Sequence, residues 1–128
     1  MANPVSARDI RRVIANATSL QVADRANIIM RVLAAMSACG VNQVLMMPEN
    51  GGICSLLKRG LQREQKLGDN RFPKLEMTDT PISGTVDDTF AATQAMVASG
   101  VKAIVVLGGD GTHRAVVKVC GQVPIAGI

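Results

Sequence analysis

The chain has 128 residues, of which 48% are hydrophobic and 19% are charged, and its mean hydropathy is +0.24. This composition predicts one compact domain and excludes both a disordered segment and a multi-domain protein. Aromatic residues make up only 2%, with two Phe, no Trp and no Tyr. Because proteins that stack bases need exposed rings, we expect no nucleic-acid partner.

The balance of 14 Lys and Arg against 10 Asp and Glu gives a net charge of +4 and a pI near 9.3. This excess suits a small phosphate-bearing ligand better than a nucleic-acid duplex. The cysteines, Cys39, Cys54 and Cys120, lie far apart and predict reduced packing residues of a cytoplasmic protein. No run reaches the ~18 apolar residues of a membrane span, so no membrane association is expected.

Helical and strand periods alternate along the sequence, which predicts an α/β fold. Capping-box spacings start the first two predicted helices: Ser6 with Asp9 ahead of residues 7–16, and Thr18 with Gln21 ahead of a longer helix. The apolar residues of the longer helix recur in steps of three and four on one face: Val22, Ala26, Ile29, Leu33 and Met36.

Strand and helix signals continue through the middle of the chain. Gly40 is expected to end the long helix in a left-handed conformation. Strands are predicted over residues 44–47 and 75–77, with a helix between them from Ile53 to about Gly60 or beyond. The basic segment over residues 58–74 is either a solvated helix end and loop or a rim that attracts phosphate.

The last third of the chain carries the strongest strand signal. A capping-box spacing from Thr85 to Asp88 predicts a helix that ends at Gly100, with Phe90, Met96 and Val97 facing inward. The sequence VKAIVVL over residues 101–107 is nearly all aliphatic, as in a central strand that helices cover on both faces. A helix over residues 113–119 and a final strand in VPIAGI follow.

The motif GGDGT directly follows the predicted central strand and precedes a helix. An open parallel sheet binds its ligand at this place, beyond the carboxyl ends of the strands. Gly108, Gly109 and Gly111 allow positive φ and close approach to phosphates, the helix start offers unpaired N–H groups, and Thr112 adds a hydroxyl. No GK[ST] follows, so the motif is not a P-loop.

Asp110 is the most informative residue of this motif. A carboxylate beside phosphates is unfavourable unless it holds a metal ion or takes a proton from an attacking hydroxyl. The alternative is that Asp110 and its glycine make a tight turn and cap the helix. His113 and Arg114 follow in the first helical turn, where each either points to the ligand or faces solvent, and Arg114 has the charge to pair with a phosphate. One His without a thiolate partner at ligand spacing predicts no zinc site.

The stretch VKAIVVLGGDGTHRAVVK resembles the ATP-NAD kinase superfamily, and most of all its acetoin-catabolism (AcoX-type) branch. The opening NPVS resembles the NPxSG motif of that superfamily, and VLMMP resembles its second strand. Arg114 and Ala115 depart from the GGDGTxNE motif of lipid kinases, which weakens the likeness to that related family.

The resemblance implies a three-layer Rossmann-like fold with an open parallel sheet. It further implies that Asp110 activates the ribose 2′-hydroxyl of NAD, with ATP or polyphosphate as phosphoryl donor and Mg²⁺ as divalent cation. The residues expected to contact the nucleotides are Asn3, Ser6, Gly108, Gly109, Gly111, Thr112 and Arg114. No residue is assigned as a protein ligand of a metal, and the partners expected are small nucleotides and further copies of the chain in a homo-oligomer.

Members of the superfamily have an apolar strand before NPxS and a β-rich second domain, whereas here only Met1 and Ala2 precede Asn3. We therefore expect residues 1–128 to form an incomplete nucleotide-binding domain without its first strand and without the second domain. Two functions are compatible with this expectation. One is the nucleotide-binding part of a longer NAD kinase-like enzyme, inactive by itself, and the other is a non-catalytic nucleotide-sensing or assembly module linked to acetoin catabolism.

Overall fold

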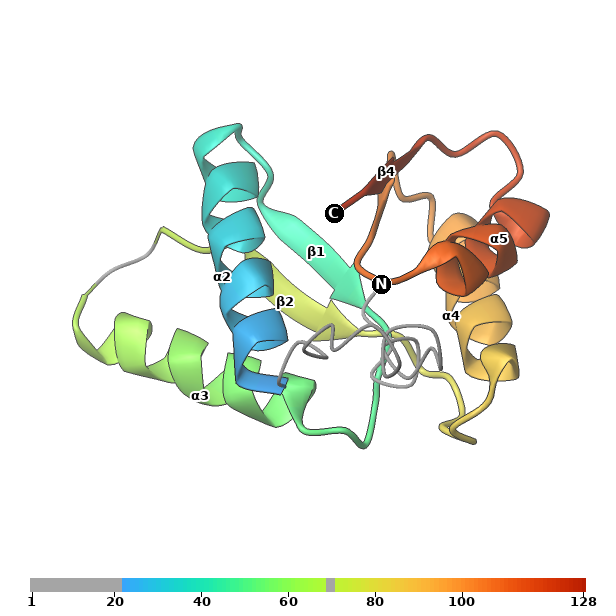
Figure 1. Cartoon of the computed structure of the whole chain (residues 1–128). Coiled ribbons are helices and arrows are strands. Elements are labelled where there is room, and N and C mark those ends of the chain that lie inside the picture. Colours follow the sequence, from blue (N-terminus) through green and yellow to red (C-terminus); the bar gives the residue numbers. More distant parts are fainter. Residues whose placement is uncertain (1–21, 69–70) are drawn as a thin grey trace.

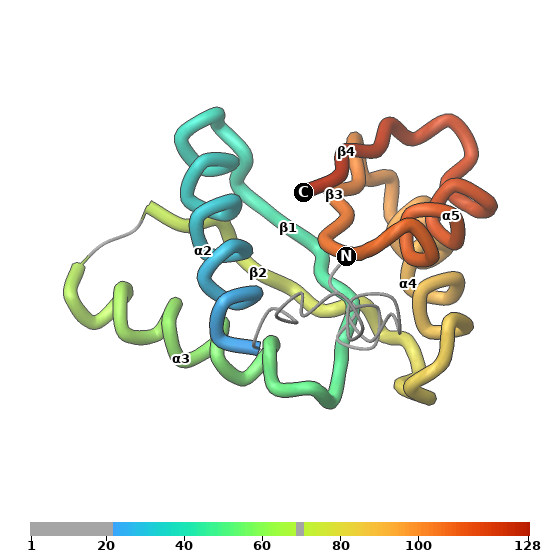
Figure 2. The backbone as a smooth tube through the Cα atoms, in the orientation of Figure 1, coloured from blue at the N-terminus to red at the C-terminus, as the bar shows by residue number. Residues whose placement is uncertain are grey.

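The computed structural model describes residues 22–68 and 71–128, which form two α/β units with parallel strands (Figure 1). The path of the chain through these units is followed most easily in Figure 2. Several sequence predictions lie outside the described residues: the helix over residues 7–16, the phosphate-side residues Asn3 and Ser6, and the capping residues Thr18 and Gln21.

The first unit contains helix α2 (Val22–Ala38), strand β1 (Gln43–Met46), helix α3 (Ile53–Lys66) and strand β2 (Lys74–Met77). Strands β1 and β2 pair in parallel, and α2 packs against α3. Buried aliphatic side chains from these elements form one core cluster: Ala26, Met46, Ile53 and Leu57. Of the predicted apolar stripe of α2, Ala26 is in this core, Leu33 is buried and Ile29 packs against the cluster, whereas Val22 at the start of the helix is 36% exposed. Gly40 follows the helix with the expected positive φ of 86°.

The second unit contains helix α4 (Val86–Ala98), strand β3 (Ile104–Val106), helix α5 (Asp110–Val119) and strand β4 (Ile125–Gly127). Strands β3 and β4 pair in parallel, and α4 packs against α5. Its core cluster is again free of aromatic rings and consists of Ile104, Val106, Val116 and Cys120. The scarcity of Phe, Tyr and Trp therefore leaves both units with aliphatic cores.

The predicted α/β class is confirmed, but within the described residues the four strands form two separate two-stranded sheets. The units still pack together, because Leu107, directly after β3, contacts the cluster that contains Met46 at the end of β1. A third cluster, around Met47 and Met96, joins the end of β1 to α4. The carboxyl ends of β1 and β3 are thereby held near one another, while one continuous three-layer sheet stays a prediction.

Helix α3 and strand β3 differ from the prediction in their bounds, and helix α4 differs in which side chains it buries. Helix α3 continues to Lys66, because its polar residues are straight-chain helix formers. Strand β3 is shorter than the predicted residues 101–107, because its ladder to β4 spans only Ile104–Val106. Helix α4 buries Met96, but Phe90 and Val97 are only half-buried, and small polar side chains such as Thr89 and Thr93 lie deeper.

The start of α4 is fixed by two polar side chains, Thr85 and Asp88. The Thr85 hydroxyl accepts a hydrogen bond from the N–H of Asp87 at 3.2 Å. The Asp88 carboxylate accepts bonds from the Ser83 hydroxyl at 2.6 Å and from the N–H groups of Ser83 and Gly84, each at 2.8 Å. These donors, with the Ser83 hydroxyl the strongest, lower the pKa of Asp88 below its ordinary value.

We predict that Asp88→Asn lowers the stability of the fold at neutral pH. In this variant the stability should also fall less when the pH is lowered. Since the pKa of Asp88 is lower in the folded chain than the ordinary 3.8, the carboxylate stabilises the fold above pH 3.8. That contribution is lost as the pH falls through the pKa of the folded state. Urea unfolding at pH 7 and at several values below pH 4 measures the effect, with the exposed Asp79→Asn as control. Equal acid dependence in both variants would contradict the prediction.

Candidate functional site

The GGDGT residues form the end of a loop and the first turn of α5. The helix begins at Asp110, three residues earlier than predicted, and Gly109 is its N-cap residue with φ of −82° and ψ of −178°. The positive φ expected for Gly108, Gly109 and Gly111 is found at none of the three, so their backbone conformations are ones that other residues also adopt. Gly111 lies within the first helical turn, where glycine is a poor helix former.

No packing contact within the described fold explains why residue 111 is glycine. A Cβ placed on Gly111 would meet no protein atom within 4 Å, so nothing in the described fold requires the absence of a side chain. The residue is exposed at the start of α5. Absence of a side chain at an open helix start allows a ligand to approach the backbone closely.

The start of α5 offers backbone donors to such a ligand. The carbonyl oxygen of Gly109 accepts hydrogen bonds from the N–H groups of Thr112 at 3.0 Å and His113 at 3.2 Å. The preceding N–H groups, those of Asp110 and Gly111, have no hydrogen-bond partner within the described part of the chain. Together with the positive end of the helix dipole, free N–H groups at a helix start favour a phosphate group.

The side chains of this turn divide into an exposed and a buried set. Asp110 and Arg114 are exposed, whereas Thr112 is only 4% exposed. No side chain caps α5, so Asp110 does not have the capping role that was its structural alternative. The carboxylate and the guanidinium of Arg114 are thus available to a ligand, while Thr112 lies mainly within the protein.

His113 does not point outward to a ligand. Its Nδ1 lies 3.1 Å from the carbonyl oxygen of Gly109, which fits an N–H donor at that nitrogen. The opposite side of the ring lies against Gly127 of β4, where an added Cβ would be 2.5 Å from Nε2. His113 therefore joins the GGDGT loop to the neighbouring strand, a contact between distant residues that local sequence patterns do not predict.

A second acidic residue, Glu49, follows the carboxyl end of β1 and was not among the predicted site residues. Its Oε1 accepts a hydrogen bond from the N–H of Cys54 at 2.6 Å, at the start of α3. Its Oε2 is buried without a hydrogen-bond partner among residues 22–68 and 71–128. Burial and the negative charge of Glu49 raise the pKa of the Cys54 thiol to about 11, so this cysteine stays protonated at neutral pH.

The metal-binding capacity of the site is limited. Within the described residues no group of three or more His, Cys, Asp or Glu side chains lies close enough to hold a metal ion. Mg²⁺ in phosphoryl-transfer sites is commonly held by one or two carboxylates together with the phosphates of the substrate. Asp110 is an exposed carboxylate at a helix start whose free N–H groups favour phosphate, and this arrangement is compatible with that mode.

We predict that Gly127→Ala destabilises the fold by about 1–2 kcal/mol, because the new methyl group displaces the His113 ring from Gly109. In a His113→Ala background the same change should cost about 1 kcal/mol less, since the ring is absent. Denaturant unfolding of the two single variants and the double variant measures this coupling. Additive effects would show that the cost of Gly127→Ala does not arise from the His113 ring, and would contradict the prediction.

These features define an α/β domain in which a glycine-rich loop joins a buried parallel strand to the start of a helix. A family model described as the ATP-NAD kinase N-terminal domain matches residues 12–128. The chain belongs to this family. No solved structure matches it.

A curated relative gives the branch of the family. Acetoin catabolism protein X of Cupriavidus necator is 58% identical to the chain over 128 residues. The match covers 100% of this chain but 35% of the relative, so the chain spans about a third of the length of that protein. The likeness to the acetoin-catabolism branch, indicated by GGDGTHR and NPVS, is thereby confirmed. No described helix has the length and apolar character needed to span a membrane.

Proposed function

We propose that the chain is the nucleotide-binding part of an NAD kinase-like enzyme, which in a longer polypeptide phosphorylates NAD to NADP with ATP or polyphosphate. The observation that carries this proposal is the start of α5. There, two N–H groups without partners in the described residues, an open glycine and an exposed carboxylate lie together directly after strand β3. Family membership narrows the ligand to a nucleotide.

Phosphate binding is assigned to the backbone of this turn. Gly108, Gly109 and Gly111 let phosphate oxygens approach, and the N–H groups of Asp110 and Gly111 donate to them. Arg114, exposed one turn further along α5, adds a positive charge that pairs with phosphate. Asn3 and Ser6 are proposed as further phosphate-side contacts on the basis of the NPVS motif, and Thr112 as a hydroxyl donor from the buried side.

Asp110 is proposed as the general base of phosphoryl transfer. Its carboxylate takes the proton of the ribose 2′-hydroxyl as that oxygen forms a bond to the terminal phosphorus of the donor. The bond from this phosphorus to the bridging oxygen breaks, and ADP or shortened polyphosphate leaves with the electron pair. A divalent cation such as Mg²⁺, when bound, neutralises charge on the transferred group, and Asp110 would contribute to holding it.

A second function rests on the name of the relative, Acetoin catabolism protein X, which ties that protein to acetoin catabolism. In this alternative the domain binds a nucleotide as a sensing or assembly module and transfers no phosphoryl group. The exposed helix start would then serve binding alone. A cytoplasmic location and a homo-oligomeric state are proposed for either function.

We predict that Asp110→Asn, introduced into the longer protein that contains this chain, lowers kcat for NADP formation by about 10²- to 10⁴-fold, because the general base is lost. Nucleotide affinity should stay equal or increase, since a negative charge beside the phosphates is removed. The assay is NADP formation from NAD, ATP and Mg²⁺, combined with calorimetric binding of NAD.

Asp87→Asn is the matched control, because Asp87 is also an exposed carboxylate in a first helical turn, that of α4. It should leave kcat unchanged. An unchanged kcat in Asp110→Asn would refute the role of Asp110 as base. Binding of NAD without any NADP formed by the unmodified longer protein would instead favour the sensing module.

A further inference from the structure

The exposed side of helix α3 carries positive charge and no acid. The helix lies at the outside of the first unit, and its buried residues Ile53 and Leu57 belong to the core (Figure 1). Its exposed residues are four cations and three neutral polar side chains: Lys58, Arg59, Arg63 and Lys66, with Ser55, Gln62 and Gln65. Since the net charge of the chain is +4, these four cations equal its whole excess of positive charge.

Three of the cations form a row along the helix. Arg59, Arg63 and Lys66 follow one another in steps of four and three residues, which places them on the same side of α3. At a rise of 1.5 Å per residue the row is about 10 Å long. Lys58 lies beside it. The outer side of α3 therefore presents a line of positive charges to solvent.

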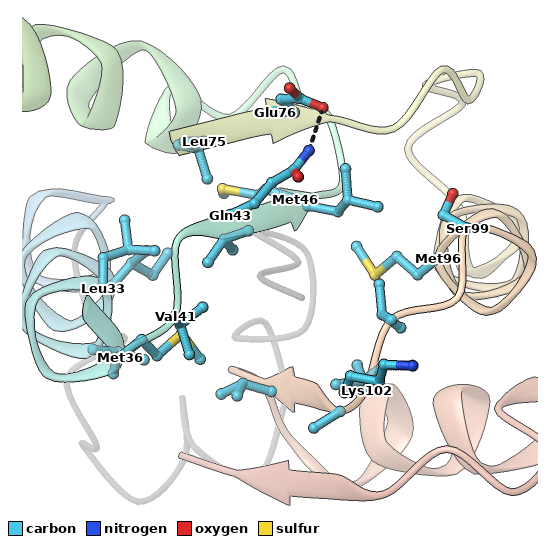
Figure 3. Close-up of a pocket in the computed structure, with 18 of the residues that line it drawn as sticks. Leu33, Met36, Val41, Gln43, Met46, Leu75, Glu76, Met96, Ser99 and Lys102 are labelled. Atoms are coloured by element: carbon cyan, nitrogen blue, oxygen red, sulfur yellow. Dashed lines mark hydrogen bonds between the residues drawn. The ribbon is translucent and has the colours of Figure 1, made fainter. Parts of the chain in front are cut away.

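Two acids of the first unit are already paired with other cations. Glu64 forms an ion pair with Arg71 at 3.1 Å. Glu76 of β2 forms one with Lys74 at 2.6 Å and also accepts a hydrogen bond from the side chain of Gln43 at 3.0 Å, the dashed line in Figure 3. Among residues 22–68 and 71–128, the four exposed cations of α3 take part in no ion pair. Their charge is not neutralised within the described fold.

Helix stability does not explain the row. Arg59 and Arg63 are four residues apart, and like charges at this spacing repel one another. The helix dipole favours Arg63 and Lys66, which lie in the last turn, but its effect does not extend to Arg59. The Nε of Arg59 donates only within its own helix, to the carbonyl oxygen of Ser55 at 3.4 Å. A row that opposes folding indicates a ligand that neutralises it.

The composition of this surface favours one kind of anionic ligand. The centre of a protein interface has aromatic or apolar anchors, whereas the residues between these cations are polar. The apolar side of α3 is buried and Leu67, 71% exposed, is a single apolar residue beyond its end, so insertion into a membrane is not favoured. Single-stranded nucleic acid needs rings for stacking, and Phe72 and Phe90 are both half-buried.

We propose that the exposed side of α3 is a docking surface for inorganic polyphosphate, a linear polyanion without bases. Its successive phosphates pair with Arg59, Arg63 and Lys66, and Lys58 adds a contact at the side of the row. Each guanidinium holds two phosphate oxygens, and each ammonium acts as a point charge. The proposal goes beyond the proposed function, because the surface is separate from the GGDGT turn and docking requires no phosphoryl transfer.

The experiment removes charge from the row and measures binding in the longer protein that contains this chain. Calorimetric titration with polyphosphate of about 15 units should give an affinity about 10-fold lower or more in the double variant Arg59→Gln, Arg63→Gln. The matched control, Lys102→Gln with Lys118→Gln, removes two exposed cations outside α3. It should change the affinity by less than about 2-fold, because nonlocal charge acts weakly through salt solution.

Salt dependence tests whether the contacts are ionic. With four cations engaged, the logarithm of the binding constant should fall with the logarithm of salt concentration at a slope of about −3, and by about 1.4 less in the α3 double variant. Tripolyphosphate, which is too short to follow the whole row, should bind more weakly than the longer chain. Without ligand the α3 double variant should have an equal or higher Tm, because glutamine is a good helix former and the repulsion is removed.

Four results would overturn the proposal. The first is an equal loss of polyphosphate affinity in the α3 variant and in the control. The second is an affinity for tripolyphosphate equal to that for the longer chain. The third is tighter binding of poly-uridylate RNA or of a poly-glutamate peptide through the same residues, which would identify a nucleic acid or an acidic protein as the partner. The fourth is a lower Tm of the α3 variant without ligand, which would show that the row stabilises the fold.

Discussion

The arrangement of this chain depends on the way parallel strands are connected. A parallel pair does not allow a tight turn, so each pair needs a helix that returns the chain to the other end of the sheet. That helix must cover an aliphatic face, and α3 and α5 do so with Ile53, Leu57 and Val116. The same constraint places the loops after β1 and β3 at one edge, where Leu107 contacts the cluster around Met46. The candidate site lies at this edge because the helical connections between parallel strands bring both loops there.

At that edge, the carbonyl oxygen of Gly109 organises the first turn of α5. It accepts two backbone hydrogen bonds and lies beside Nδ1 of His113. These bonds satisfy the N–H groups of Thr112 and His113, whereas those of Asp110 and Gly111 have no partner in the described part of the chain. Because His113 also contacts Gly127, the orientation of the turn is linked to β4 as well as to β3. The proposed phosphate site is thus supported from two strands.

The sequence predicts those parts of the fold that depend on local patterns. The cap at Thr85 and the left-handed Gly40 and Gly100 follow from spacing and from backbone preferences, and the structure contains them. It also contains the apolar stripe of α2, apart from the exposed Val22. The start of α5 was predicted too late, because GGDGT has the composition of a turn but adopts helical structure at Asp110.

What could not be predicted are contacts between residues distant in the sequence. The contact of His113 with Gly127 and the burial of Oε2 of Glu49 both depend on how loops and strands meet in three dimensions. For Glu49, the only signal in the sequence is an acid between Pro48 and the Asn-Gly-Gly turn that precedes a helix. Asp110, in contrast, could be proposed from the sequence because its motif has a chemical meaning of its own, independent of packing.

The environment of Cys54 has a consequence for redox chemistry. Oxidants and alkylating reagents attack the thiolate, and a thiol with a pKa of about 11 supplies almost none of it at neutral pH. Cys120 is buried, and Cys39 is exposed at the end of α2. Mild oxidation would therefore modify the chain at the far end of α2 first. The edge that carries the GGDGT turn and Glu49 would remain chemically intact under conditions that inactivate enzymes with a reactive cysteine in the nucleotide site.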